Sequence, residues 1–190
     1  MLETNRGWKY ICEEKRERQQ KEIPSSWIIE PPHPEQFDVM SVPADCGLLS
    51  TKELEITESV DAELLLRKLA EGEWTSLEVT TAYYKRAIVA HQVVRRSYIL
   101  RAPHDTSDFS IQTNCLTEIF VQRALDRAKE VDDYLTRNGR PIGPLHGLPV
   151  SLKDQFMIKG LETVMGGFYV ISFCEIDYVQ TQVMQVMLRG

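Results

Sequence analysis

Lys153 is the residue whose surroundings in the sequence best suit chemistry. A lysine works as a base only when burial or a nearby positive charge lowers its pKa and leaves the amine neutral. The run before it, residues 147–152, carries no charge, which favours a catalytic lysine in a site of low dielectric constant. In the alternative interpretation, Lys153 and Asp154 simply end a strand in water. The pattern alone leaves both interpretations open.

The histidines and cysteines indicate no second centre. No two histidines are spaced i, i+4, and none lies at metal-ligand spacing from a carboxylate, so we expect no metal site at His33, His91, His104 or His146. His146 is interpreted as a loop residue with a structural hydrogen bond. The cysteines lie far apart with no C-x-x-C pair, which indicates reduced thiols at Cys12, Cys46, Cys115 and Cys174.

Length and composition exclude several classes of protein. The 190 residues suit one ordinary domain, and 22 Lys and Arg against 28 Asp and Glu give a formal net charge of −6. Such an acidic chain has no electrostatic footprint for nucleic acid. No apolar run approaches the roughly 20 residues of a membrane span, and the first residues lack a signal peptide's apolar segment. We therefore expect a soluble, cytoplasmic protein that binds neither nucleic acid nor membrane.

The first half of the sequence predicts helices. Mixed charges over residues 8–21 indicate a solvated helix, and the prolines that follow predict an extended arm. From Thr57 we expect a capped helix whose apolar face carries Val60, Leu65 and Leu69. A capping box at residues 75–78 predicts a second helix, with an apolar stripe through Leu77, Tyr84 and Ile88.

The second half predicts a β-α-β unit, so the fold class is mixed α/β. Residues 115–120 are expected to form a strand, residues 121–135 a helix closed by Asn138 and Gly139, and residues 149–154 a second strand. A right-handed crossover would make the two strands parallel. Sites in such sheets form beyond the carboxyl ends of the strands, where Lys153 and Asp154 stand.

The sequence resembles the amidase signature family, and its amino-terminal arm resembles the fungal acetamidase or general amidase type. The resemblance covers the amino-terminal portion of that family and depends most on residues 143–156. It continues through residues 158–160 and 163–166, and it extends upstream to residues 116–120 with the helix after them and to residues 56–76. The implied fold is that of an amidase with an incomplete sheet.

The resemblance also implies an activity. In the family, a lysine at the position of Lys153 is the base of a Ser-cisSer-Lys triad that hydrolyses a small carboxylic amide to acid and ammonia. No cofactor and no metal are implied. The two serines belong to a Gly/Ser-rich stretch downstream, and we find no such stretch in these residues. We therefore expect a truncated, inactive chain, in which any residual hydrolysis would first point to Ser151.

The sequence departs from the family in two segments. Residues 93–112 are interpreted as an insertion, either a translated intron or a genuine surface loop, and are expected to be loop-like and poorly packed. Residues 167–190 form a divergent tail. The predicted organisation is an arm over 1–56, the first part of an amidase domain over 57–166, and this tail.

Other functions stay open. A non-catalytic fragment could act by association, because residues 168–173 form an apolar, uncharged stretch suited to strand pairing and self-association. Within the family, the alternative is the A-type subunit of an amidotransferase, against which the long arm and the acidic balance weigh. A membrane-anchored fatty-acid amide hydrolase is disfavoured, because no anchoring helix is expected before Thr57.

Overall fold

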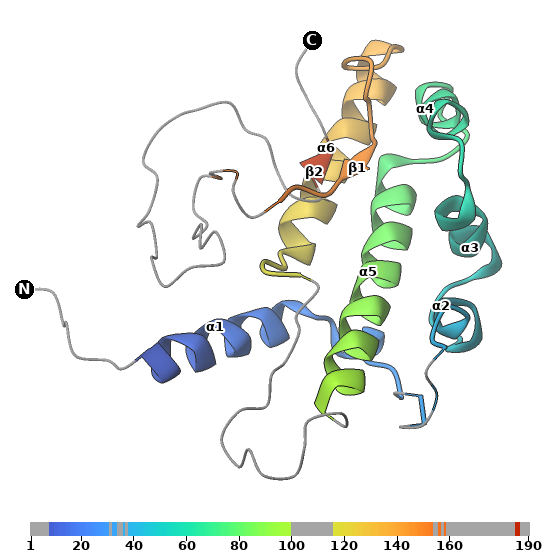
Figure 1. Ribbon diagram of the computed structural model, residues 1–190. Helices are drawn as coiled ribbons and strands as arrows, with labels where there is room; N and C mark the ends of the chain where they lie inside the picture. Colours follow the sequence, from blue (N-terminus) through green and yellow to red (C-terminus); the bar gives the residue numbers. More distant parts are fainter. Residues whose placement is uncertain are drawn as a thin grey trace, which may run out of the picture.

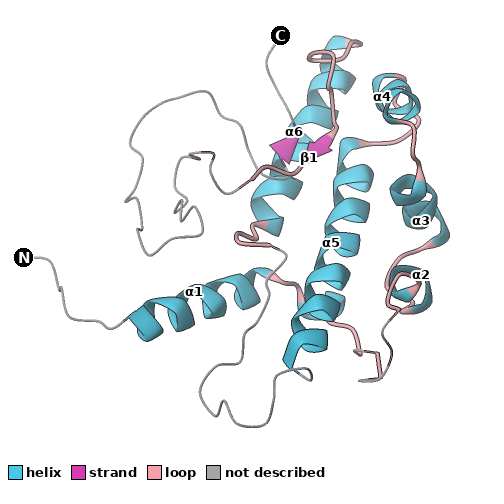
Figure 2. Cartoon of the chain, in the orientation of Figure 1, coloured by secondary structure: helices cyan, strands magenta, loops and turns pink. Residues whose placement is uncertain are grey.

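The computed structural model describes residues 8–30, 32–33, 36, 38–99, 116–153, 156, 158 and 185–186. These residues are mostly helical (Figures 1 and 2). The helices are α1 (Trp8–Glu22), the short 3-10 helix η1 (Ser25–Trp27), α2 (Val42–Asp45), α3 (Thr51–Glu58), α4 (Ala62–Ala70), α5 (Ser76–Ile99) and α6 (Val121–Asn138). Two short strands are assigned, β1 (Pro149–Val150) and β2 (Gln185–Val186).

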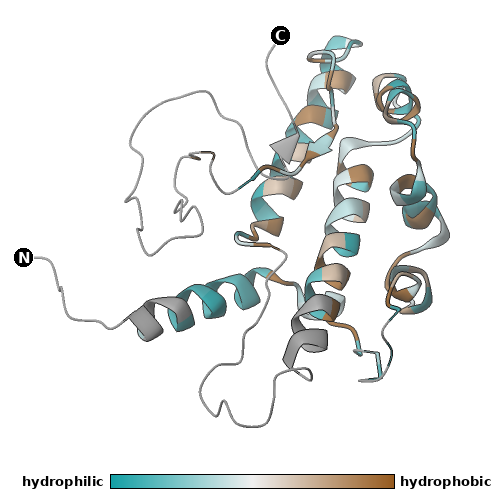
Figure 3. Cartoon of the chain, viewed as in Figure 1, coloured by the Kyte–Doolittle hydropathy of each residue, from teal (hydrophilic) through white to brown (hydrophobic). Residues whose placement is uncertain are grey.

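Helix α5 is the centre of the arrangement. It stands between α6 on one side and the column of α2, α3 and α4 on the other (Figure 1). Apolar faces of these helices turn toward α5, while the charged α1 is hydrophilic along most of its exposed length (Figure 3). The helices expected in the first half of the chain are thus confirmed.

Capping fixes the start of α5 as the sequence predicts. The Thr75 hydroxyl accepts a hydrogen bond from the backbone N–H of Glu78 at 3.1 Å, and the Glu78 carboxylate accepts one from the N–H of Thr75 at 3.1 Å. The expected stripe is also confirmed, because Tyr84 and Ile88 are buried with Trp27 and Ile119 in one cluster.

The expected helix from Thr57 is wrong in its boundary. Thr57 lies in the last turn of α3, which begins with its own capping box at Ser50 and Glu53. Helix α4 begins later, because the carboxylate of Asp61 accepts hydrogen bonds from two backbone N–H groups of its first turn. The break leaves Val60 fully exposed, so this residue does not belong to the apolar face that buries Leu65 and Leu69.

Only part of the β-α-β unit is present in the described residues. Helix α6 ends as expected at Gly139, whose φ of 63° closes the helix in the left-handed region. Residues 116–120 form no assigned strand: Gln19 of α1 donates to the carbonyl of Thr117, and Lys15 forms a 2.5 Å ion pair with Glu118. The first of these contacts occupies a backbone carbonyl that a strand would offer to a neighbour, and the second is an ion pair between side chains.

Strand β1 is shorter than expected and has a different partner. Pro149 and Val150 pair antiparallel with residues 185–186, and not with a parallel strand at residues 116–120. The described part of the chain therefore contains no complete sheet, as expected for an incomplete one.

The expected insertion is helical where the structure describes it. Helix α5 continues to Ile99, and Val93 is buried with Val42, Leu49 and Val89. The expectation of a poorly packed loop is therefore wrong for the first residues of this segment, because Val93 extends the apolar face of α5. Residues 100–112 and the tail at 167–184 lie outside the described residues. The division of the chain at 56 and 166 stays a prediction, and α3 runs across the first of these boundaries.

Candidate functional site

The segment that precedes Lys153 begins as a compact turn over residues 142–148. The backbone N–H of His146 donates to the carbonyl of Gly143 at 3.1 Å, and the N–H of Leu148 donates to the carbonyl of Leu145 at 3.2 Å. The Nδ1 atom of His146 accepts a hydrogen bond from the N–H of Ile142 at 3.2 Å. The interpretation of His146 as a loop residue with a structural hydrogen bond is therefore confirmed.

Gly147 brings this turn into close contact with the helices. Its φ is +76°, a conformation that favours glycine, and a Cβ built there would lie 2.5 Å from Ser76 Oγ and 2.9 Å from Leu69 Cδ2. The turn thus packs directly on the end of α4 and the start of α5. A side chain at position 147 would therefore require the Ser76 and Leu69 side chains, or the turn itself, to move.

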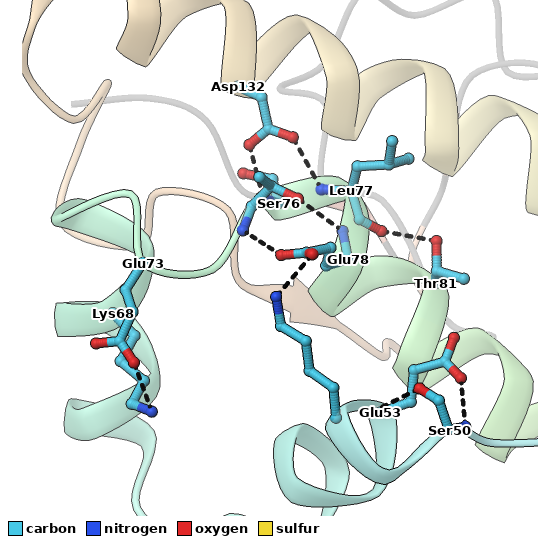
Figure 4. A network of polar contacts seen from close by, with 11 residues as sticks. Ser50, Glu53, Lys68, Glu73, Ser76, Leu77, Glu78, Thr81 and Asp132 are labelled. Atoms are coloured by element: carbon cyan, nitrogen blue, oxygen red, sulfur yellow. Dashed lines mark hydrogen bonds and ion pairs between the residues drawn. The ribbon is translucent and has the colours of Figure 1, made fainter.

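The start of α5 is held from across the molecule by Asp132 of α6. One carboxylate oxygen of Asp132 accepts from the N–H of Ser76 at 2.6 Å and the other accepts from the N–H of Leu77 at 3.0 Å (Figure 4). These are two of the N–H groups that a helix leaves unpaired at its first turn. Glu78 adds an ion pair with Lys52 of α3 at 2.7 Å. One polar network therefore joins α3, α5 and α6 at the base of the turn.

Lys153 follows β1 in a segment without regular secondary structure, and it is exposed. Its carbonyl accepts from the N–H of Phe156 at 3.1 Å. Ser151 is also exposed, while Asp154 lies outside the described residues. The burial that a lysine base requires is thus not supplied by the part of the chain described. The catalytic role of Lys153 stays a prediction.

Two further observations bear on the site. Among the described residues, no three His, Cys, Asp or Glu side chains are grouped so as to hold a metal ion. No described helix is long and apolar enough to cross a membrane.

The sequence did not identify Asp132 or Ser76 as residues of this site. Asp132 stands in the middle of a charged, amphipathic helix, where a carboxylate is ordinarily a solvated surface group. The only available signal was that the first turn of α5 needs acceptors for its N–H groups, and the capping box at residues 75–78 satisfied that need locally.

Comparison with known proteins identifies the relatives of this arrangement. The model of the amidase family matches residues 96–173, the stretch that contains α6, the turn and Lys153. The acetamidase of Emericella nidulans is 42% identical over 160 residues, which are 84% of this chain and 25% of that protein. The chain is related to the fungal amidases. An amidase of Gibberella moniliformis is 36% identical over 172 residues, covering 87% of this chain and 28% of its own length.

A solved structure agrees with this relationship. A fatty acid amide hydrolase matches with a TM-score of 0.69 and 33% identity, over 85% of this chain and 26% of that one. The described residues therefore share the fold of the corresponding part of that mixed α/β hydrolase, and helices predominate among them. The chain spans about a quarter of the length of the curated relatives it matches.

Proposed function

We propose that this chain contributes the lysine segment of an amidase that hydrolyses carboxylic amides to acid and ammonia. The observation that carries the proposal is the 42% identity with an acetamidase over 84% of the chain. The compact turn at residues 142–148 supports it, because it fixes the start of the strand that leads to Lys153.

The proposed chemistry is nucleophilic catalysis with Lys153 as the base. Neutral Lys153 takes a proton from a serine network, and the serine oxygen attacks the amide carbonyl to form a tetrahedral adduct. The adduct collapses to an acyl-enzyme, and the proton goes to the departing ammonia. Water then attacks the acyl group, releases the acid and restores the serine. Hydrogen-bond donors must stabilise the oxyanion during both attacks.

The 190 residues on their own are proposed to be inactive. By resemblance, the serines and the oxyanion donors belong to a Gly/Ser-rich stretch, and these residues contain none. Lys153 is exposed, so nothing in the described residues holds it in the low-dielectric surroundings that keep a lysine neutral. A positioned base alone contributes only about 10²–10⁴-fold to a rate.

Ammonia release from acetamide and benzamide tests the inactivity directly. The purified chain should show no release above the buffer background at pH 7–9. Hydrolysis that disappears in Lys153→Ala would contradict this part of the proposal and would make Ser151 the next residue to mutate.

A chimera tests the role of the segment. The matching quarter of the Emericella nidulans acetamidase is replaced by this chain, and acetamide hydrolysis is measured. We expect an active chimera that Lys153→Ala inactivates, while Lys129→Ala keeps its activity, because Lys129 makes only a surface contact on α6. An active Lys153→Ala chimera would exclude Lys153 as the base.

The alternatives have their own supporting observations and tests. The names of the relatives, acetamidase and amidase, favour a free amidase over the A-type subunit of an amidotransferase. Self-association through residues 168–173 stays a prediction on residues outside those described. Size-exclusion chromatography tests it, since a monomer over a range of concentrations would speak against association.

A further inference from the structure

Buried polar atoms without hydrogen-bond partners gather where the turn meets α5. Ser76 and Thr80 lie one helical turn apart on α5, both fully buried, and neither hydroxyl has a partner among the described residues. His146 is 2% exposed, and its Nε2 has no such partner either. Gly147 connects the groups, since its Cα lies against Ser76. Burying polar groups without partners lowers the free energy of unfolding, so the contact between the turn and α5 depends on the hydrogen bonds that do form there, such as the one to His146 Nδ1.

The hydrogen bond to His146 assigns the state of its ring. Because Nδ1 accepts from the N–H of Ile142, Nδ1 carries no proton, and the single ring proton is on Nε2. A second proton on Nδ1 would turn the acceptor into a donor and set two donors against each other. It would also place a positive charge at a buried position. Neutral imidazole is therefore the form of His146 that keeps the hydrogen bond from Ile142.

We propose that His146 is the positioning residue for Lys153: its neutral ring closes the turn at residues 142–148, and protonation of the ring releases the strand that carries Lys153. The inference rests on the proposed function for the role of Lys153. The link along the chain is short, because the turn runs directly into β1 and Lys153 follows three residues after the end of that strand.

The charges around His146 do not reverse this expectation. From α6 it faces Asp132, whose attraction favours the protonated ring, but Asp132 is already bonded to two N–H groups of α5. The neighbouring Gly147 lies against Leu69 of α4 and Ser76 of α5, which are uncharged. Its own segment carries Arg140 and Lys153, both positive. Burial lowers the pKa of His146 below its ordinary 6.5 and outweighs Asp132.

The direction of the pH effect follows. The folded-state pKa lies below the unfolded one, so the turn is fully closed above about pH 6.5 and opens as the pH falls further. Burial raises the pKa of the Glu53 and Glu78 carboxyls, but hydrogen bonds outweigh it and hold the pKa of both below the ordinary 4.5. The pH range between these values is therefore the range in which a histidine changes its charge.

Amide hydrogen exchange of the full 190-residue chain, followed by NMR from pH 7.5 to 5 and corrected for intrinsic rates, tests the inference. Protection of the Ile142 amide, which bonds to His146, and of the Phe156 amide, which bonds to Lys153, should fall together by about 10-fold or more. Protection of Val89 in the core should not change over this range.

Variants separate positioning from a merely structural role. In His146→Asn the amide oxygen takes the place of Nδ1, so protection at pH 7.5 should persist and the pH step should vanish. His146→Gln places its polar atoms further out and should lose protection at both amides by about 10-fold at every pH. His33→Asn, at an exposed histidine, should behave as the wild type.

Several results would overturn the inference: a pH-independent wild type, a pH step that persists in His146→Asn, or a Phe156 amide that ignores the change at Ile142. If His146→Gln unfolds the chain, the pH profiles of amide protection in the wild type and in His146→Asn still test the inference. None of these measurements requires catalysis. An inactive chimera would therefore contradict the proposed function alone, and a missing pH step would contradict this inference alone.

Discussion

Gly147→Ala is the substitution whose consequence the structure defines most sharply. The new methyl group would lie 2.5 Å from Ser76 Oγ, 2.9 Å from Leu69 Cδ2 and 3.3 Å from Ser76 Cβ. Real Cβ atoms do not approach other atoms at the first two distances, so the Ser76 and Leu69 side chains, or the turn itself, must shift. The backbone conformation adds a second penalty, because φ at this position is +76°.

The magnitude is the sum of these two effects. Left-handed backbone costs an alanine about 1–2 kcal/mol relative to glycine, and overpacking of a close contact costs about 1–3 kcal/mol. Gly147→Ala should therefore lower the free energy of unfolding by about 2–5 kcal/mol. Gly139→Ala is the matched control, since φ there is +63° but a Cβ would meet nothing within 4 Å. Its cost should be the backbone share alone, about 1–2 kcal/mol.

Urea denaturation followed by circular dichroism measures both variants, with an unchanged slope as the condition for comparing them. A third variant isolates the contact: in the Ser76→Ala background the nearest atom is gone, so Gly147→Ala should cost at least about 0.5 kcal/mol less. Equal losses in Gly147→Ala and Gly139→Ala would refute the argument, since they would show that the turn does not press on α5.

Three further changes test the framework around the site. Asp132→Ala should lower the free energy of unfolding, measured by urea denaturation, by about 1–3 kcal/mol, because two N–H groups at the start of α5 lose their acceptors. The control Asp126→Ala, on the exposed face of the same helix, should change this free energy little. Glu53→Gln should lower the free energy of unfolding by about 1 kcal/mol at pH 7 and should reduce the loss of stability below about pH 4.5. Burial raises the pKa of Glu53, but hydrogen bonds outweigh it and hold the pKa low, so the stability that the Glu53 carboxylate contributes is present above that pH and lost below it. Ile88→Ala should cost about 2–5 kcal/mol because the side chain is fully buried, whereas Val60→Ala, fully exposed, should cost almost nothing; equal thermal shifts would contradict the assignment of the core.

Local signals explain which parts of the fold could be predicted. The capping box at residues 75–78 and the glycine after α6 act within one helical turn, and both ends are where the sequence places them. The apolar stripe through Tyr84 and Ile88 is buried as its period requires. The start of the preceding helix was misplaced at Thr57 because two capping signals compete within a few residues, and Asp61 provides the better acceptor.

The sequence predicted some features of the candidate site and missed others. The resemblance to the amidases and the structural hydrogen bond of His146 were both expected from the sequence. The strand at residues 115–120 was not confirmed in the described residues, because strand pairing depends on partners far along the chain. Here α1 binds Thr117 and Glu118 through Gln19 and Lys15, which no local pattern records.

The sequence by itself determined where α5 begins and where α6 ends, because these features depend on neighbours within a few residues. Only the tertiary structure decided that Asp132 would cap α5 from another helix, that Gly147 would press on Ser76, and that Lys153 would be exposed. Each of these three features depends on contacts between segments that lie some tens of residues apart in the sequence. Burial and long-range hydrogen bonds are properties of that meeting, and a one-dimensional pattern contains no record of it.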